Sequence, residues 1–308
     1  MDERLLDALW RVPSLRGRTP EEVGPRRMGG LTNENYRVEA DGEAYVLRIP
    51  GRGTSEYIDR EVEEHNARAA AEAGVNADVV FFDAADGLML TRYLEGCETM
   101  SPESFTTRDG VPARAGLVLK RMHASGQQFR FRFELFAMIE NYLKVLGEKD
   151  VALPEGYHDV VGEAGAVREA LEARPPELAP CHNDPLTENF MDDGERAWLL
   201  DWEYSGMNDP FWDLGDVSVE AGLSEEQDLQ MLEAYRGAGV SPEDVGRTTI
   251  YKAMADLLWT LWGLIQYAND NPTDDYWAYS TQRFERCRRL MESPGFGDHL
   301  RAVRTGRR

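Results

Sequence analysis

Strand-like runs of apolar residues dominate the first third of the chain, and they alternate with polar positions where one face of a strand would meet water. Glycine-containing turns are expected at 41–42 and 85–87, which would join the runs into two hairpins. Between the hairpins, residues 56–73 lack Gly and Pro, are rich in Glu and Ala, and predict a helix. The four predicted strands lie at 29–38, 45–49, 79–82 and 88–94.

Helical periodicity replaces the strand pattern beyond Ser101. We therefore place a boundary near residues 94–96 and expect two units, a small β-rich lobe at 1–94 and a larger lobe at 95–308. The predicted fold class is α+β, with one main helix in the small lobe and a mainly α-helical large lobe. Helices in the large lobe are predicted at 113–124, 133–147, 159–174, 224–237 and 247–268.

Charge and composition narrow the classes of protein. The 308 residues carry 34 basic and 56 acidic side chains, a net charge of −22, which argues against binding to nucleic acid. No apolar stretch is long enough for a membrane span, and the N-terminus lacks the apolar core of a signal peptide, which predicts a cytoplasmic protein. The three cysteines are widely spaced, so buried thiols are expected rather than a disulfide or a zinc site.

The densest chemistry lies between Cys181 and Glu203, in the segments CHNDPLTENF and WLLDWE. Transfer of a phosphoryl group requires a carboxylate to orient the attacking hydroxyl and oxygen ligands for Mg²⁺. Asp184, Asn189 and Asp201 supply such a set, provided that a hairpin with its turn at 193–194 folds Asp201 back beside Asn189.

This segment resembles the catalytic segment of the aminoglycoside phosphotransferase and choline kinase superfamily, whose members are relatives of protein kinases. The resemblance covers roughly residues 24–270. It implies a protein-kinase-like two-lobed fold, ATP and Mg²⁺ as cofactors, Asp184 as the catalytic base or orienting residue, and Asn189 and Asp201 as magnesium ligands. His182 is interpreted as a buried structural residue rather than a general base.

The small lobe is expected to bind the nucleotide. A Gly-Gly turn at the start of its first strand predicts a phosphate-binding loop, with Gly30, Thr32, Asn33 and Asn35 as cofactor-binding residues. Kinases also place a cation on a strand of this lobe, and a glutamate from the next helix pairs with it. The lobe contains no lysine, so Arg48 is assigned that role. Among Glu61, Glu63 and Glu64, the resemblance favours Glu63 as the partner.

The arginine in this strand resembles the pattern of choline and ethanolamine kinases, which carry an arginine at this position. Most aminoglycoside phosphotransferases carry a lysine there. The segment from Gly29 to Tyr36 is similar to the start of the bacterial choline kinases, and the segment from Asp201 to Gly215 resembles the choline kinase version of the metal-binding segment. A quaternary ammonium group binds to aromatic faces with a carboxylate nearby. The candidate acceptor-site residues are Glu203, Tyr204, Asp209, Trp259 and Trp262.

The sequence leaves three interpretations of the function. The first is an ATP-dependent kinase that phosphorylates a small cationic alcohol, choline before ethanolamine. The second is a related kinase for thiamine or an aminoglycoside, and the third is a kinase-like binding module with little activity. Trp259 and Trp262 could equally belong to an apolar stripe that packs into the core of the protein. The sequence leaves the oligomeric state open, and a homodimer is one possibility.

Overall fold

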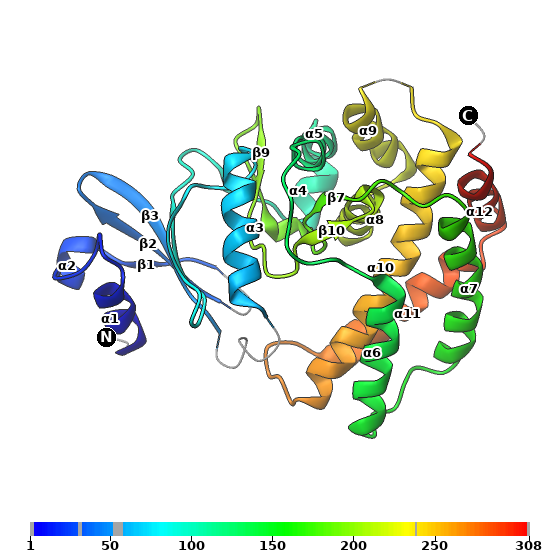
Figure 1. The fold of residues 1–308 in the computed structure, drawn as a ribbon, viewed down its shortest axis with the longest axis horizontal. Coiled ribbons are helices and arrows are strands. Elements are labelled where there is room, and N and C mark those ends of the chain that lie inside the picture. The colour runs from blue at the N-terminus through cyan, green and yellow to red at the C-terminus, as the bar shows by residue number, and fades with distance from the viewer. Residues whose placement is uncertain (1–2, 30–32, 52–57, 238, 307–308) are drawn as a thin grey trace.

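A small lobe built on one sheet packs beside a larger helical lobe (Figure 1) in the computed structural model, which describes residues 3–29, 33–51, 58–237 and 239–306. The division into a β-rich and a helical part agrees with the prediction from periodicity. The elements of the small lobe are α1 (Glu3–Arg11), α2 (Pro20–Val23), β1 (Arg26–Arg27), β2 (Glu34–Ala40), β3 (Glu43–Ile49), α3 (Arg60–Glu72), β4 (Val79–Asp83) and β5 (Leu88–Arg92).

The five strands form one antiparallel sheet in the order β1-β2-β3-β5-β4. Tyr45, Leu47 and Ile49 of β3 belong to the apolar cluster that α1 covers on one face of this sheet. Because successive side chains of a strand point to opposite faces, Arg48 lies on the other face. This is the alternation that the sequence predicts.

Helix α3 lies between the sheet and the large lobe (Figure 1). The Asp59 side chain caps its first turn by accepting hydrogen bonds from the backbone N–H groups of Glu61 and Val62. Farther along the helix, Ala67 and Ala70 are buried in the core of the large lobe. The helix thus carries side chains of the small lobe to the boundary between the lobes. Residues 56 and 57 of the predicted helix lie outside the described residues.

The large lobe contains nine helices in the described ranges, together with short strands near the small lobe. The helices are α4 (Pro102–Thr107), α5 (Val111–His123), α6 (Leu135–Glu148), α7 (Tyr157–Ala173), α8 (Pro210–Ala221), α9 (Glu225–Arg236), α10 (Pro242–Ala268), α11 (Tyr276–Met291) and α12 (Phe296–Thr305). The short elements are β6 (Glu98–Thr99), β7 (Ala179–Cys181), η2 (Thr187–Asn189), β8 (Phe190–Asp192), β9 (Ala197–Leu199) and β10 (Gly206–Asn208).

Helix α8 is absent from the helices that periodicity predicts. Nearly all of its side chains are buried, including the polar Asp213, Asp216 and Ser218, so it has no polar face to give a helical period. It lies in the centre of the large lobe against α10 (Figure 1). Among the described residues, every helix is too short or too polar to cross a lipid bilayer.

Candidate active site

The catalytic loop joins β7 to the 3₁₀ turn η2, and a hairpin of β8 and β9 follows it. In that hairpin Phe190 pairs with Leu199, as the turn at 193–194 predicts. The Leu200 N–H donates to the Asn189 carbonyl at 2.9 Å, which brings the next residue, Asp201, back toward Asn189. The Asn189 amide donates to the Asp184 carbonyl at 3.0 Å. The structure therefore brings the three residues of the motif together.

Asp184 is partly buried at the end of this loop. Burial, together with the negative charge of Glu220, raises the pKa of its carboxyl group to about 7. A carboxylate with a pKa near neutrality can accept a proton from an alcohol that it orients.

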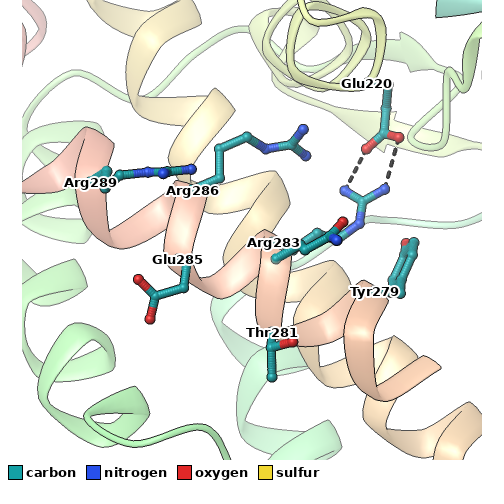
Figure 2. Close-up of a pocket in the computed structure, with 8 residues that line it drawn as sticks. Glu220, Tyr279, Thr281, Arg283, Glu285, Arg286 and Arg289 are labelled. Atoms are coloured by element: carbon teal, nitrogen blue, oxygen red, sulfur yellow. Dashed lines mark hydrogen bonds and ion pairs between the residues drawn. The ribbon is translucent and has the colours of Figure 1, made fainter. Parts of the chain in front are cut away.

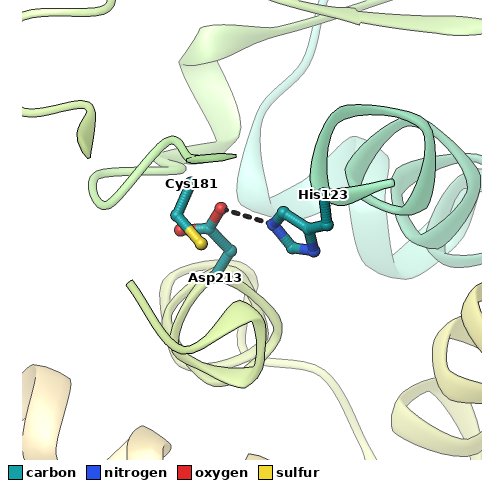
Figure 3. Close-up of side chains that lie close together, drawn as sticks. All are labelled: His123, Cys181 and Asp213. Carbon is teal, nitrogen blue, oxygen red and sulfur yellow. Dashed lines mark hydrogen bonds and ion pairs between the residues drawn. The ribbon is translucent and has the colours of Figure 1, made fainter. Parts of the chain in front are cut away.

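Asp213 of α8 holds the backbone of the catalytic loop. Its two carboxylate oxygens accept hydrogen bonds from the N–H groups of His182 and Asn183, both at 2.8 Å. His123 of α5 donates from Nε2 to the same carboxylate at 2.9 Å (Figure 3). Asn183 adopts a φ of 67°, which the paired loop backbone stabilises. Sequence reasoning missed Asp213 and His123, although Asp213 stands in the quoted segment from Asp201 to Gly215.

His182 is completely buried and packs against Trp202, with ring centroids 4.9 Å apart. Its Nε2 donates to the Leu200 carbonyl at 2.8 Å, which ties the loop to the strand before Asp201. Burial lowers the pKa of the imidazole below its ordinary value. A neutral, buried ring in this position agrees with the structural interpretation.

On the small-lobe side, Arg48 pairs with Glu63. The Arg48 Nη2 lies 2.5 Å from the Glu63 Oε1, and both side chains are almost fully buried. Glu61 is exposed and Glu64 pairs with Arg68, so Glu63 is the helix glutamate that faces the strand. Asn35 of β2 pairs with Arg48 of β3. Of the other predicted phosphate-binding residues, Gly30 and Thr32 lie outside the described residues.

Asp201 and Glu203 of the large lobe lie close to the guanidinium group of Arg48. The Arg48 Nη1 is 3.5 Å from Asp201 and 3.8 Å from Glu203. Burial and the charge of Glu203 raise the pKa of Asp201 above its ordinary range. The placement of Glu203 differs from the expectation of an acceptor-site acid. The chain turns at 203–204, so that Glu203 points toward the small lobe and accepts a hydrogen bond from Asn33 at 3.1 Å.

Tyr204, Trp259 and Trp262 form an aromatic cluster with edge-to-face contacts. The ring of Trp259 lies 5.7 Å from Tyr204 and 6.4 Å from Trp262, and the Trp262 Nε1 donates to the Tyr204 hydroxyl at 3.1 Å. Tyr276 and Tyr279 of α11 extend the cluster, 5.7 and 5.9 Å from Trp262.

The cluster adjoins the catalytic loop. The Asn183 side chain, next to Asp184 in sequence, donates to the Tyr204 carbonyl at 3.0 Å. The Trp259 Nε1 donates to the Asp216 carboxylate at 3.2 Å. Burial and the charge of Glu220 raise the pKa of Asp216 well above its ordinary value. Sequence reasoning missed Asp216 and Glu220, which lie one turn apart on the non-amphipathic helix α8.

Glu220 borders a cavity of about 580 Å³ beside α11 (Figure 2). Its carboxylate receives two hydrogen bonds from Arg283, and the Arg283 guanidinium lies over the Tyr279 ring at 4.4 Å. The cavity thus opens next to the aromatic cluster.

Asp209 lies apart from the aromatic cluster at the N-terminus of α8. Its carboxylate accepts hydrogen bonds from Arg247 at 2.6 Å, from the Tyr251 hydroxyl at 2.9 Å and from the Phe211 N–H at 3.0 Å. Because these partners already satisfy and neutralise the buried carboxylate, the contacts assign Asp209 to helix capping, in contrast to the acceptor-site role that the sequence suggested.

A lobed fold with a catalytic loop, paired metal-ligand candidates and a buried Arg–Glu pair defines a kinase-like phosphotransferase, and residues 25–248 match the phosphotransferase enzyme family (APH). The chain belongs to this family. It is 30% identical to LicA of Haemophilus influenzae over 270 aligned residues. The alignment covers 85% of this chain and 99% of that protein.

Solved structures give the same relationship. A choline/ethanolamine kinase family protein from Mesorhizobium loti is 55% identical, covers 99% of both chains and superposes with a TM-score of 0.90. The choline kinase LicA from Streptococcus pneumoniae is 25% identical, with 87% of this chain and 92% of that chain covered and a TM-score of 0.71. The predicted kinase-like fold, the resemblance to choline and ethanolamine kinases, and the class of phosphotransferase acting on an alcohol are confirmed.

Proposed function

We propose that this protein is an ATP- and Mg²⁺-dependent kinase that transfers the γ-phosphoryl group to the hydroxyl of a small cationic amino alcohol, with choline as the first candidate. The observation that carries this proposal is the aromatic cluster of Tyr204, Trp259 and Trp262 next to the loop that holds Asp184. The relatives named as choline kinases support the same substrate class. A cytoplasmic location, where ATP is available, belongs to the same proposal.

The residues around Arg48 suit a nucleotide with its metal ion. The buried Arg48 Nη1 and Asp201 Oδ1 have no hydrogen-bond partner among the described residues, although the two atoms lie 3.5 Å apart. Carboxylate oxygens of Glu63, Asp201 and Glu203 lie within 4.8 Å of one another. Hard oxygen donors in such a group match the preference of Mg²⁺. Asn189 and Asp201 would hold the ion, which offsets phosphate charge when bound.

Asp184 would orient the acceptor hydroxyl and take up its proton as the new O–P bond forms and the bond between the γ-phosphorus and the β,γ-bridging oxygen of ATP breaks, which releases ADP. Its raised pKa suits this role, because the carboxylate is a stronger base than an exposed aspartate. Asp213 would keep the loop in place through the N–H groups of His182 and Asn183. Arg48 would bind phosphate oxygens with a planar guanidinium that Glu63 keeps oriented.

The aromatic cluster would bind the cationic end of the acceptor. A quaternary ammonium group has no N–H to donate, so ring faces and nearby negative charge are what can stabilise it. Asp216 and Glu220 bring acidic groups to this side of the site. A polycationic aminoglycoside would gain less from a compact group of rings than from several exposed acids, which favours a small acceptor.

Turnover of ATP with a panel of alcohols tests the proposal. Purified protein, ATP and Mg²⁺ are incubated with choline, ethanolamine, thiamine or an aminoglycoside, and the phosphorylated product is identified by mass spectrometry. We expect choline to give the highest kcat/KM. Preferential phosphorylation of an aminoglycoside would contradict the assigned substrate class. Nucleotide binding without any product would instead identify a kinase-like binding module.

A further inference from the structure

Arg60, the first residue of α3, is a buried cation to which the proposed reaction assigns no role. Its side chain is only 3% exposed, and its Nη1 lies 2.5 Å from Glu63 Oε2 and 2.8 Å from Glu203 Oε1. A single guanidinium nitrogen therefore bridges a carboxylate of the small lobe to a carboxylate that follows Asp201 in the large lobe.

Glu203 is the point at which several segments of the small lobe meet the large lobe. Its Oε1 accepts hydrogen bonds from Arg60 and from the Asn33 amide, and it lies 3.8 Å from Arg48. The Asn33 Oδ1 in turn accepts the Gly51 N–H at 3.1 Å. The position of Glu203 is thus coupled to β3, to α3 and to the residue that precedes β2.

The stem of Arg60 is held by the turn between β4 and β5. A Cβ atom at Gly87 would lie 2.6 Å from the Arg60 Nε, so the turn packs directly on the arginine. The Gly87 carbonyl also accepts a hydrogen bond from Arg48 at 3.2 Å. This packing fixes the direction of the Arg60 side chain before any ligand binds, which lowers the ordering cost of its ion pairs with Glu63 and Glu203.

We propose that Arg60 is a positioning residue that acts through Glu203. Glu63, Asp201 and Glu203 are close enough to repel one another, and the shared Arg60 cation offsets this repulsion between Glu63 and Glu203. In this way Arg60 keeps Asp201 and Arg48 at the separation that the nucleotide and its metal ion require. The proposal rests on the function proposed above, because it concerns the nucleotide side of the same site.

Replacement of Arg60 by Met tests the proposal, since Met keeps much of the length of the stem and removes the charge. We expect the dissociation constant for ADP in the presence of Mg²⁺, measured by calorimetry, to rise about 10- to 100-fold. The KM for the acceptor should change by less than about 2-fold. Arg68→Met is the matched control, because it removes a partly exposed arginine of the same helix that pairs with Glu64. It should leave nucleotide binding unchanged.

Two further measurements separate positioning from a general loss of structure. In a double-mutant cycle, Arg60→Met should weaken ADP binding much less in the Glu203→Gln background than in the wild-type background. Without any ligand, amide hydrogen exchange at 201–206 should be faster in Arg60→Met than in Arg68→Met. If Arg60→Met fails to fold, Arg60→Lys takes its place, and we expect intermediate ADP binding because an ammonium group cannot reproduce the guanidinium geometry.

Wild-type ADP affinity in Arg60→Met, or additive effects of Arg60 and Glu203 substitutions, would overturn the proposal. An equal rise in the acceptor KM would also contradict it. Calorimetry measures ADP binding without turnover, so its results test the role of Arg60 independently of the proposed kinase activity. A protein that phosphorylates none of the alcohols would reject the function, while Arg60 could still be shown to position Glu203.

Discussion

Arg48 of β3 and Glu63 of α3 form an ion pair with 2.5 Å between Nη2 and Oε1, and only 5% and 1% of their side chains are exposed. The pair connects the sheet to the helix at the boundary between the lobes. It also leaves the Arg48 Nη1 directed toward the side where Asp201 lies, at 3.5 Å. This geometry makes the pair a sensitive place to test nucleotide binding.

Two substitutions of Arg48 should distinguish the contribution of its positive charge to ATP binding from that of its planar guanidinium group. We expect Arg48→Met to lower kcat/KM for ATP by about 10²- to 10³-fold, since a preorganised cation at the phosphates is lost. Arg48→Lys should retain more activity than Arg48→Met, because an ammonium group keeps the positive charge but lacks the planar set of donors. Steady-state kinetics with varied ATP measures both. Equal activity of the wild type and Arg48→Met would remove Arg48 from the nucleotide site.

Asp184→Asn should abolish turnover without loss of stability. The pKa of Asp184 is raised to about 7 by burial and by Glu220, so the charged form is held in an unfavourable environment. A neutral amide of the same shape should therefore give a Tm equal to or above that of the wild type. We expect kcat to fall about 10²- to 10⁴-fold because the base is lost. Calorimetry with ADP serves as the control, and substantial turnover by the folded variant would refute the assignment.

Trp262→Ala should weaken binding of the acceptor. Loss of one aromatic wall is expected to raise the KM for choline about 3- to 30-fold, with little effect on the KM for ATP. Trp259 is only 3% exposed and donates to Asp216, so Trp259→Phe, which keeps a ring, is the better variant there. Trp10→Ala on α1, where the side chain is 63% exposed, is the control. An unchanged choline KM in both site variants would exclude the aromatic cage.

Stability should depend on pH through His182. Burial lowers the pKa of the folded imidazole below its ordinary 6.5, so the unfolded chain binds more protons at mildly acidic pH. The contribution of this neutral ring to stability is therefore complete above 6.5 and decreases as the pH falls through that value. His182→Gln keeps a donor for the Leu200 carbonyl and should show a shallower loss. Urea denaturation at several pH values measures the slope, and parallel slopes would contradict this assignment.

Gly87→Ala should disturb nucleotide binding more than its backbone strain explains. Gly87 has a φ of 92°, and a Cβ atom added there would lie 2.6 Å from the Arg60 Nε, whereas Gly42 has a φ of 79° and open space around the same position. Both substitutions carry the cost of a left-handed conformation. Only Gly87→Ala should also weaken binding of ADP with Mg²⁺, as measured by calorimetry. Equal nucleotide affinities in the two variants would show that the turn does not hold Arg60.

The local sequence was sufficient to predict most strands and the helix of the small lobe, and to predict which residues close together in sequence would meet in the fold. Period-2 patterns located β3 and β5, and the absence of Gly and Pro located α3. The Asp-Gly turn at 193–194 brought Asp201 back toward Asn189, because a short hairpin fixes its own register. The absence of lysine from the small lobe left Arg48 as the cation of β3.

Tertiary packing decided the direction of each long-range side chain. Glu203 and Asp209 both looked like acceptor-site acids, yet Glu203 turns to Arg60 and Asp209 is neutralised by Arg247. Asp213, Asp216 and Glu220 were missed because a helix buried on all sides carries no period that marks its functional face. Spacing along one strand or hairpin is set by local geometry, whereas the partner of a buried charge is set by elements that are distant in sequence and meet only in the folded chain.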